Sequence, residues 1–158
     1  MWTPWWGRWR KRGASLALDE LYKEVILDHY KSPRNKRPLP GAEVSRKKNN
    51  PLCGDEITVH AHLEDGLIAE ITFEGSGCSI SQASASMLTE AVEGKSVEDA
   101  EGLATRFRGM MEGKVEPSEE TFGDLMALRG VVKYPVRIKC AVLAWDVLQE
   151  ALADGTRG

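Results

Sequence analysis

The segment EITVHAHLEDGLIAEITFEG, residues 56–75, constrains the fold more than any other part of the chain. Apolar and polar residues alternate from residue 57 to residue 64, which predicts a half-buried strand, and Asp65-Gly66 then predicts a tight hairpin turn. The residues expected on the apolar face are Ile57, Val59, Ala61 and Leu63 before the turn and Leu67, Ala69, Ile71 and Phe73 after it. Two strands cannot bury such a face by themselves, so helices must cover it.

Helical patterns surround this hairpin. The first runs over residues 19–32, with Val25, Ile26 and Tyr30 on its apolar stripe. Four further helices are expected: one after the corner at Gly75 and Gly77, one from Ser96, one at residues 125–128 and one from Pro135. Residues 42–47 can add an edge strand. The sequence therefore predicts an α+β fold, with a small antiparallel sheet of about three strands packed against helices.

The chain of 158 residues has the length of an ordinary domain. We expect residues 19–153 to form it, between a Trp- and Arg-rich extension at residues 1–18 and a short tail at residues 154–158. The extension lacks the apolar region of a secretory signal. No apolar run is long enough to span a membrane, and the net charge of −3 does not favour nucleic acid as a partner.

Residues 31–48 are rich in Lys and Arg and contain Pro33, Pro38 and Pro40. This pattern predicts a mobile basic loop, which is either a solvated linker or a docking surface for an acidic partner. Because it lies next to Cys53 in the sequence, we hypothesise that Lys47 and Lys48 help a partner protein to dock.

The three cysteines of the chain fall at places suited to chemistry. Cys53 precedes a strand, Cys78 starts a helix, where the helix dipole favours a thiolate, and Cys140 lies on the inward stripe of the last helix. They are too few for a disulfide-rich scaffold, so we expect a reducing compartment, the cytoplasm. Taken singly, each is best interpreted as a buried, inert thiol.

The expected topology favours one site shared by the three cysteines. A hairpin returns the chain near its starting edge, so Cys53 and Cys78 fall at one end of the hairpin, and Asp55 shares the side of Cys53. With Cys140 these residues offer three thiolates and one carboxylate, which suit zinc or an iron–sulfur cluster. Arg137 and Lys139 can offset the excess negative charge. His60 and His62 share a strand face, but we interpret them as polar residues of the solvated face.

Four motifs in order resemble the IscU/SufU family of iron–sulfur cluster assembly proteins. They are LYKEVILDHYKSPRN, NNPLCGDEI, FEGSGCSISQASASMLTEAVEGK and YPVRIKCAVLAW. The long segment between Cys78 and Cys140 is similar to the SufU branch. In IscU scaffolds a histidine precedes the last cysteine, where this chain has Lys139, and this difference argues against a stable cluster scaffold.

The resemblance implies a zinc site formed by Cys53, Asp55, Cys78 and Cys140. It also implies a role as acceptor of persulfide sulfur, with Cys53 as the accepting residue. The partners would be a pyridoxal-phosphate-dependent cysteine desulfurase and downstream iron–sulfur assembly proteins, and any enzyme activity would be that of a zinc-dependent sulfurtransferase.

Three alternatives remain at this point. The chain can be a scaffold that assembles a [2Fe–2S] cluster for apoproteins, or a structural zinc module without a transfer step. A zinc hydrolase is the third, but a site closed by four protein ligands leaves no open position for a water nucleophile.

Overall fold

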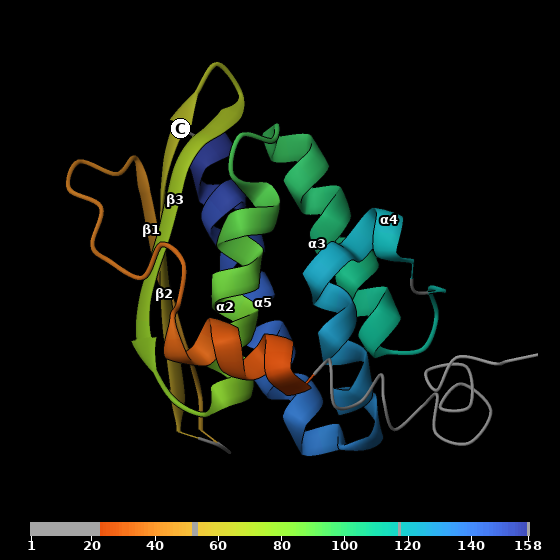
Figure 1. The fold of residues 1–158 in the computed structure, drawn as a ribbon. Coiled ribbons are helices and arrows are strands. Elements are labelled where there is room, and N and C mark those ends of the chain that lie inside the picture. Colours follow the sequence, from red (N-terminus) through yellow and green to blue (C-terminus); the bar gives the residue numbers. More distant parts are fainter. Residues whose placement is uncertain (1–22, 52–53, 117, 158) are drawn as a thin grey trace, which may run out of the picture.

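The computed structural model describes residues 23–51, 54–116 and 118–157, which form a three-stranded antiparallel sheet and a layer of helices (Figure 1). Residues 23–31 are helical. The remaining elements, in chain order, are β1 (Val44–Asn50), β2 (Asp55–Glu64), β3 (Leu67–Ser76), α2 (Ser79–Val92), α3 (Val97–Met111), α4 (Glu119–Phe122), the 3-10 helix η1 (Gly123–Lys133) and α5 (Pro135–Arg157). The predicted α+β fold with three strands is confirmed. No helix of these described ranges is long and apolar enough to cross a membrane.

The hairpin between β2 and β3 forms where the sequence predicted it. Asp65 and Gly66 have φ angles of 53° and 77°, the left-handed conformation that a two-residue turn of type I′ requires at both positions. On β2, Ile57, Val59 and Ala61 are fully buried. The local turn signal and the alternating pattern therefore agree, and together they set the direction of both strands.

The inward face predicted for β3 is wrong at Leu67 and Ala69. The pairing shifts by one residue between His62 and Leu63, so that Leu63 pairs with Ile68 while His62 pairs with Glu70. This irregularity leaves Ala69 as an extra residue and turns Ile68 inward. Ile68 is fully buried, whereas Leu67 is 46% exposed.

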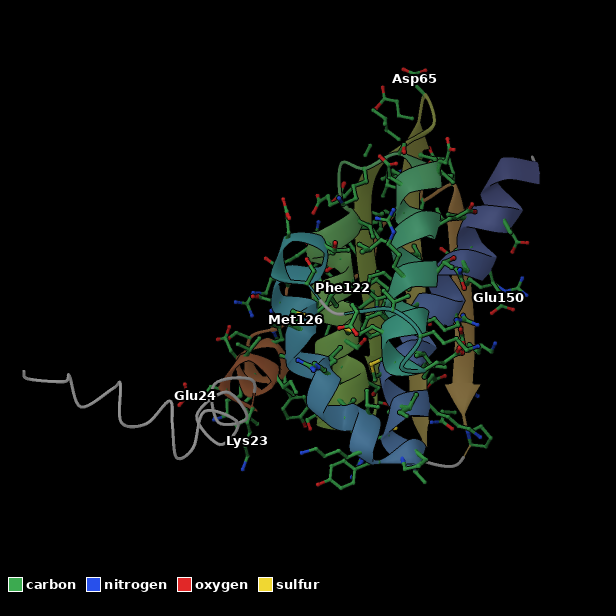
Figure 2. All side chains as sticks on the ribbon, turned by 90° about the vertical axis from the view of Figure 1, so that its right-hand side faces the viewer. Lys23, Glu24, Asp65, Phe122, Met126 and Glu150 are labelled. Carbon is green, nitrogen blue, oxygen red and sulfur yellow. The ribbon has the colours of Figure 1, made fainter. Side chains whose placement is uncertain are left out.

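Residues 44–50 form the edge strand β1, so the predicted basic loop is shorter than expected. Lys47 forms an ion pair with Glu56 of β2, and the Lys48 ammonium lies 3.5 Å from the carboxylate of Glu150 on α5. Figure 2 shows Glu150 on the outer side of α5. Exposed lysines on an edge strand are a common protection against pairing with another chain.

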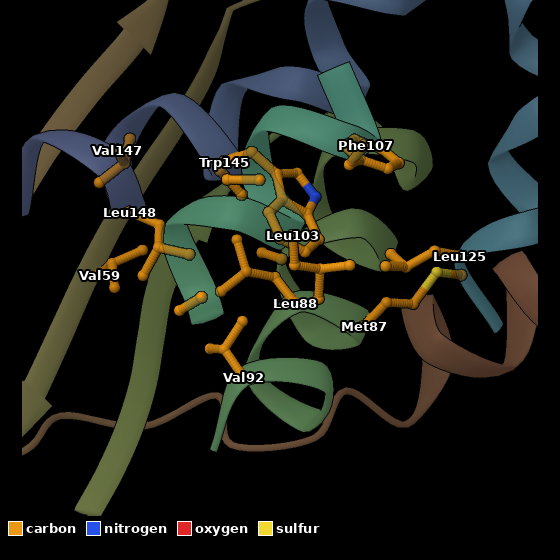
Figure 3. Packing of buried hydrophobic residues seen from close by; sticks show 14 of the residues in the cluster. Val59, Met87, Leu88, Val92, Leu103, Phe107, Leu125, Trp145, Val147 and Leu148 are labelled. Atoms are coloured by element: carbon orange, nitrogen blue, oxygen red, sulfur yellow. The ribbon is translucent and has the colours of Figure 1, made fainter. Parts of the chain in front are cut away.

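The core lies between the sheet and the helices, with α5 against β1 and β2 and α2 against β3. Figure 3 shows Trp145 of α5 beside Phe107 of α3, and their rings stack with centroids 4.8 Å apart. The small residues Ala83, Ser84 and Ala85 let α2 approach α5 closely, and the Ser84 hydroxyl donates a 2.6 Å hydrogen bond to the carbonyl of Ala141. This packing brings the first turns of α2 and α5 to the same end of the sheet.

The structure describes the C-terminal end of the chain but not the N-terminal end. The predicted extension at residues 1–18 lies outside the described residues and stays a prediction. At the other end, α5 continues through residues 154–157, where the sequence predicted a tail. A side chain at Gly155 would collide with Leu63 and Val44, so this helical end packs directly on the sheet.

Candidate metal centre

Asp55 and Cys78 meet where β2 begins and α2 starts. Asp55 is 1% exposed, and its Oδ1 accepts a 2.8 Å hydrogen bond from the backbone N–H of Cys78. Its Oδ2 lies 3.9 Å from the Cys78 Sγ. Cys78 is the N-cap residue of α2, but its own side chain caps no helix N–H. The thiol therefore stays available to a ligand at the positive end of the helix.

Gly77 makes this contact sterically possible. Its φ angle is 145°, and a Cβ there would lie 2.2 Å from the Asp55 Oδ1 and 2.9 Å from the Asp55 Cα. Both a side chain and an ordinary L-residue conformation are excluded at this point. The glycine just before Cys78 thus lets the buried carboxylate reach the backbone of the helix start.

Cys140 approaches the same point from α5 and is fully buried. Its Sγ lies 3.8 Å from the carbonyl oxygen of Val136 and 3.8 Å from Nδ2 of Asn50. Asn50 is the last residue of β1 and pairs in register with Asp55. The side chains of β1, β2, α2 and α5 therefore converge at one end of the sheet.

One ligand atom from each of Asp55, Cys78 and Cys140 lies within 4.8 Å of the other two. A zinc ion with bonds of about 2.0–2.3 Å in a tetrahedron holds its donors roughly 3.3–3.8 Å apart, so a small adjustment suffices. The donor set, two thiols and a buried carboxylate, fits a borderline-soft divalent ion. These three residues leave one tetrahedral position for a fourth donor.

Cys53 lies outside the described residues, but both flanks of its loop are described. Asn50 and Asp55 pair at the ends of β1 and β2, and the Gly54 N–H donates a 2.9 Å hydrogen bond to the Asn50 carbonyl. Gly54 has a φ angle of 70°. The loop that carries Cys53 is therefore anchored at its two ends by residues that contact Cys140 and Cys78.

Arg137 and Lys139 are both exposed on the first turns of α5. Arg137 lines a hollow together with Ser79 and Ile80, the first residues of α2. Arg137 thus lies near the start of α2, whereas Lys139 is placed only by its position in the chain, directly before Cys140. Their role in balancing its negative charge stays a prediction.

His60 and His62 lie on the outer face of β2, as predicted. His60 contacts the Ser45 hydroxyl at 2.7 Å and the Glu74 carboxylate at 2.9 Å, and His62 contacts Glu43 at 2.9 Å. Within the described ranges, neither belongs to a group of three side chains that could hold a metal ion.

Sequence reasoning missed two polar neighbours of the site. Asn50 is 7% exposed and contacts the sulfur of Cys140, and the hydroxyl of Ser81 lies 3.9 Å from the sulfur of Cys78. Ser81 follows Cys78 by three residues, which is a helical neighbour on the same face. That spacing was the available signal for Ser81, whereas the position of Asn50 depends on strand pairing.

The chain is similar to known proteins over most of its length. The family model described as NifU-like N terminal domain matches residues 21–141. The chain is 48% identical to the zinc-dependent sulfurtransferase SufU of Bacillus subtilis, over 89% of this chain and 95% of that protein. It is 44% identical to the iron-sulfur cluster assembly scaffold protein IscU of Streptococcus pyogenes, over 85% of this chain and 84% of that protein.

The fold also matches a solved structure. The crystal structure of a nitrogen-fixing NifU-like protein (N-terminal) from Brucella abortus superposes with a TM-score of 0.80 at 21% identity, and the match covers 89% of this chain and 97% of that one. At this identity the likeness concerns the fold alone.

Proposed function

The chain belongs to the family of NifU-like N-terminal domains, and from this premise we propose that it is an iron–sulfur cluster assembly protein that accepts sulfur at a zinc site. The observation that carries the proposal is the convergence of Asp55, Cys78 and Cys140, whose ligand atoms lie within 4.8 Å of one another. The zinc-dependent sulfurtransferase SufU of Bacillus subtilis, at 48% identity, supports the choice of metal.

Cys53 is proposed as the fourth zinc ligand. Its loop joins Asn50 to Asp55, which pair directly, and Cys53 is only two residues from Asp55. A chain spans at most about 3.3–3.6 Å per residue, so Cys53 cannot lie far from the other ligands. When bound, zinc would keep the four donors deprotonated and protect the thiolates from oxidation.

The ligands differ in how firmly the fold holds them. Cys78 and Cys140 are fixed by the first turns of α2 and α5, and Asp55 is held by the N–H of Cys78. Cys53 instead falls in the sequence between the end of β1 at Asn50 and the start of β2 at Asp55. We therefore assign Cys53 as the acceptor, since it can leave the metal while the other three ligands stay in place.

The transfer step follows thiol–disulfide chemistry. The thiolate of Cys53 attacks the outer sulfur of a persulfide on a cysteine desulfurase, and a new S–S bond forms on Cys53. The S–S bond of the donor breaks, and its electron pair leaves with the cysteine thiolate of the desulfurase. The step needs no external oxidant or reductant, and a downstream thiol can remove the sulfur in the same way.

Arg137 and Lys139 are proposed to balance charge during this step. Three thiolates and one carboxylate on a divalent ion leave an excess of two negative charges, and the persulfide is itself an anion. Both cationic side chains are exposed on α5 beside Cys140, where they can attract the incoming anionic group. We place this chemistry in the cytoplasm, where thiols remain reduced.

The second candidate is a scaffold for a [2Fe–2S] cluster, since thiolates are also cluster ligands. The relative in Streptococcus pyogenes, a scaffold protein, supports it, whereas Lys139 in place of a histidine does not. Anaerobic purification separates the two. We expect about one zinc per chain and no visible absorption, and a brown, labile chromophore would instead establish the scaffold.

The transfer itself is tested with a desulfurase, free cysteine as substrate and a reducing thiol that releases the transferred sulfur as sulfide. The wild-type chain should increase sulfide release, Cys53→Ser should not, and Thr105→Ser on the exposed face of α3 should behave as wild type. If Cys53→Ser retained the full increase, the site would be a structural zinc module and the acceptor role would be lost.

A further inference from the structure

A second group of potential metal ligands lies away from the cysteines. It consists of His29 in the helical segment 23–31, Glu90 on α2 and Asp124 on η1. The His29 Nε2 is 3.2 Å from the Asp124 Oδ2 and 3.7 Å from the Glu90 Oε1, and the three atoms lie within 4.8 Å of one another. We propose that these residues form a second divalent-cation site, made of nitrogen and oxygen donors.

The environment of His29 favours a ligand role for Nε2. The imidazole is 1% exposed, and its Nδ1 lies 2.8 Å from the Ser86 hydroxyl. The same hydroxyl accepts a 2.8 Å hydrogen bond from the backbone N–H of Arg34, which fixes its position. Histidines that bind metals commonly use one ring nitrogen for the ion and donate the other N–H to an oxygen. The Ser86 hydroxyl places such an oxygen beside Nδ1 of His29.

The two carboxylates are aimed at the same nitrogen from different elements. Ser86 and Glu90 are four residues apart on α2 and therefore share a face, so one holds Nδ1 while the other approaches Nε2. Asp124 comes from η1, and Figure 2 shows its chain neighbours Phe122 and Met126 on the side of the molecule where Lys23 and Glu24 begin the helical segment. A cation here would tie three separate elements together.

Charge around this point is unbalanced. The carboxylates of Asp28, Glu90 and Asp124 surround the guanidinium of Arg34, which lies 2.7 Å from Asp28 and 3.9 Å from Glu90. With His29 neutral, these groups carry two net negative charges, which is the charge that a divalent ion neutralises. Glu90 also stands in the last turn of α2, where the helix dipole disfavours an anion, and that turn itself contains no basic residue.

The site is accessible from solvent. The side chains of Glu90 and Asp124 are 49% and 64% exposed, and both line a hollow of about 280 Å³ beside Met87 and Phe122. Water can therefore enter with an ion and complete its coordination. One imidazole with two carboxylates suits Mn²⁺, Fe²⁺ or Zn²⁺, whereas the thiols near Cys78 select softer ions.

Manganese is the probe that distinguishes the two sites. Titration of the zinc-loaded full chain with Mn²⁺, followed by calorimetry and electron paramagnetic resonance, should show one Mn²⁺ per chain. Glu90→Gln and Asp124→Asn should each weaken binding by more than about tenfold, and the double variant should abolish it. Glu98→Gln, an exposed carboxylate on α3, is the matched control and should bind as wild type.

Two further measurements identify the ligands. Cys78→Ser should leave Mn²⁺ binding unchanged, because the second site shares no residue with the cysteines. The imidazole nitrogen of His29 should couple to the bound Mn²⁺ in pulsed resonance spectra, and His29→Gln should remove that coupling. If the wild-type chain bound no Mn²⁺, or if the double variant bound it as well as wild type, His29 would be an ion-paired core residue and the site would not exist. The exposed carboxylate variants decide this even if His29→Gln fails to fold.

Discussion

The buried carboxylate of Asp55 accepts a 2.8 Å hydrogen bond from the backbone N–H of Cys78. One side chain at the start of β2 thereby orients the start of α2, and its second oxygen stays 3.9 Å from the Cys78 sulfur. The carboxylate has two tasks at once: it holds the helix start and it offers a charged ligand to a metal ion. The two tasks can be separated by substitution.

Asp55→Asn should weaken zinc binding more than it weakens the fold. The amide oxygen can still accept the Cys78 N–H, so the geometry survives, but the negative charge that binds zinc is lost. We expect zinc affinity to fall by roughly 10–100-fold, measured by competition with a chelator. Asp55→Ala should in addition cost about 1–3 kcal/mol of unfolding free energy, because the partly buried N–H of Cys78 loses its acceptor. Equal zinc affinity in wild type and Asp55→Asn would remove Asp55 from the ligand set.

Gly77→Ala should destabilise the protein through the same contact. The new Cβ would lie 2.2 Å from the Asp55 Oδ1, at a φ angle of 145°, so the strand and helix start must move apart. We expect a loss of at least about 1–3 kcal/mol and weaker zinc binding. Gly102→Ala in α3 is the control, because its Cβ would meet nothing within 4 Å and alanine should stabilise that helix by up to about 1 kcal/mol. Chemical denaturation with and without zinc measures both, and unchanged stability in Gly77→Ala would contradict the steric account.

The sequence predicted the features that neighbouring residues encode, and it missed those that depend on contacts between residues distant in the chain. The hairpin turn at Asp65-Gly66 and the start of α2 after Cys78 are encoded by neighbouring residues, so both were predictable. The inward turn of Ile68 was not, because a shift in register depends on how β2 and β3 pair. Similarly, Tyr30 was expected inside, but Tyr30 is 45% exposed while His29 is buried. His29 is covered by α2 and η1, which are distant in sequence.

The same distinction applies to the candidate metal centre. The motifs marked Asp55, Cys78 and Cys140, and the hairpin explained why the first two lie together. The arrival of Cys140 depends on the close packing of α5 against α2, and the contact of Asn50 depends on the pairing of β1 with β2. A single sequence has no local signal for either. The fold supplies the missing distances, whereas the acceptor role of Cys53 remains a proposal.

Asp146 should make stability fall as the pH rises through the acidic range. Burial raises the pKa of its carboxyl above the ordinary 3.8, although Arg108 opposes this shift. Between the ordinary and the raised pKa, the folded chain keeps a proton that the unfolded chain has lost, so the unfolding free energy decreases with pH. Asp146→Asn should remove this slope, measured as the difference from wild type in urea denaturation at a series of acidic pH values.

Asp28→Asn provides a control with the opposite sign. The hydrogen bond from Arg34 lowers the pKa of Asp28, so its contribution to stability is present above the ordinary pKa and is lost as the pH falls through the lowered one. Relative to wild type, Asp28→Asn should therefore lose stability as the pH rises. If the stability difference from wild type had a pH slope of the same sign in both variants, burial would not be the factor that sets the pKa of Asp146.

Charge reversal on β1 should weaken docking of a cysteine desulfurase. Lys47 and Lys48 lie on an edge strand that leads directly to the Cys53 loop, and both remain roughly half exposed although they pair with Glu56 and Glu150. Lys47→Glu combined with Lys48→Glu should lower the affinity, and the loss should shrink at high salt, because the attraction is screened within about 10 Å at 0.1 M.

The control for this effect is Lys95→Glu. Lys95 is exposed, and its backbone carbonyl accepts a hydrogen bond from the N–H of Ile68 beside the hairpin turn. This turn lies at the end of the sheet opposite Cys78, so charge reversal at Lys95 should leave docking unchanged. Reversal on β1 also places Glu beside Glu56 and Glu150, which should cost no more than about 1 kcal/mol per pair at these exposed positions. Affinity is therefore measured at a temperature where denaturation shows both variants fully folded. Equal affinity in the β1 variant and wild type, at low salt, would exclude β1 as the docking surface.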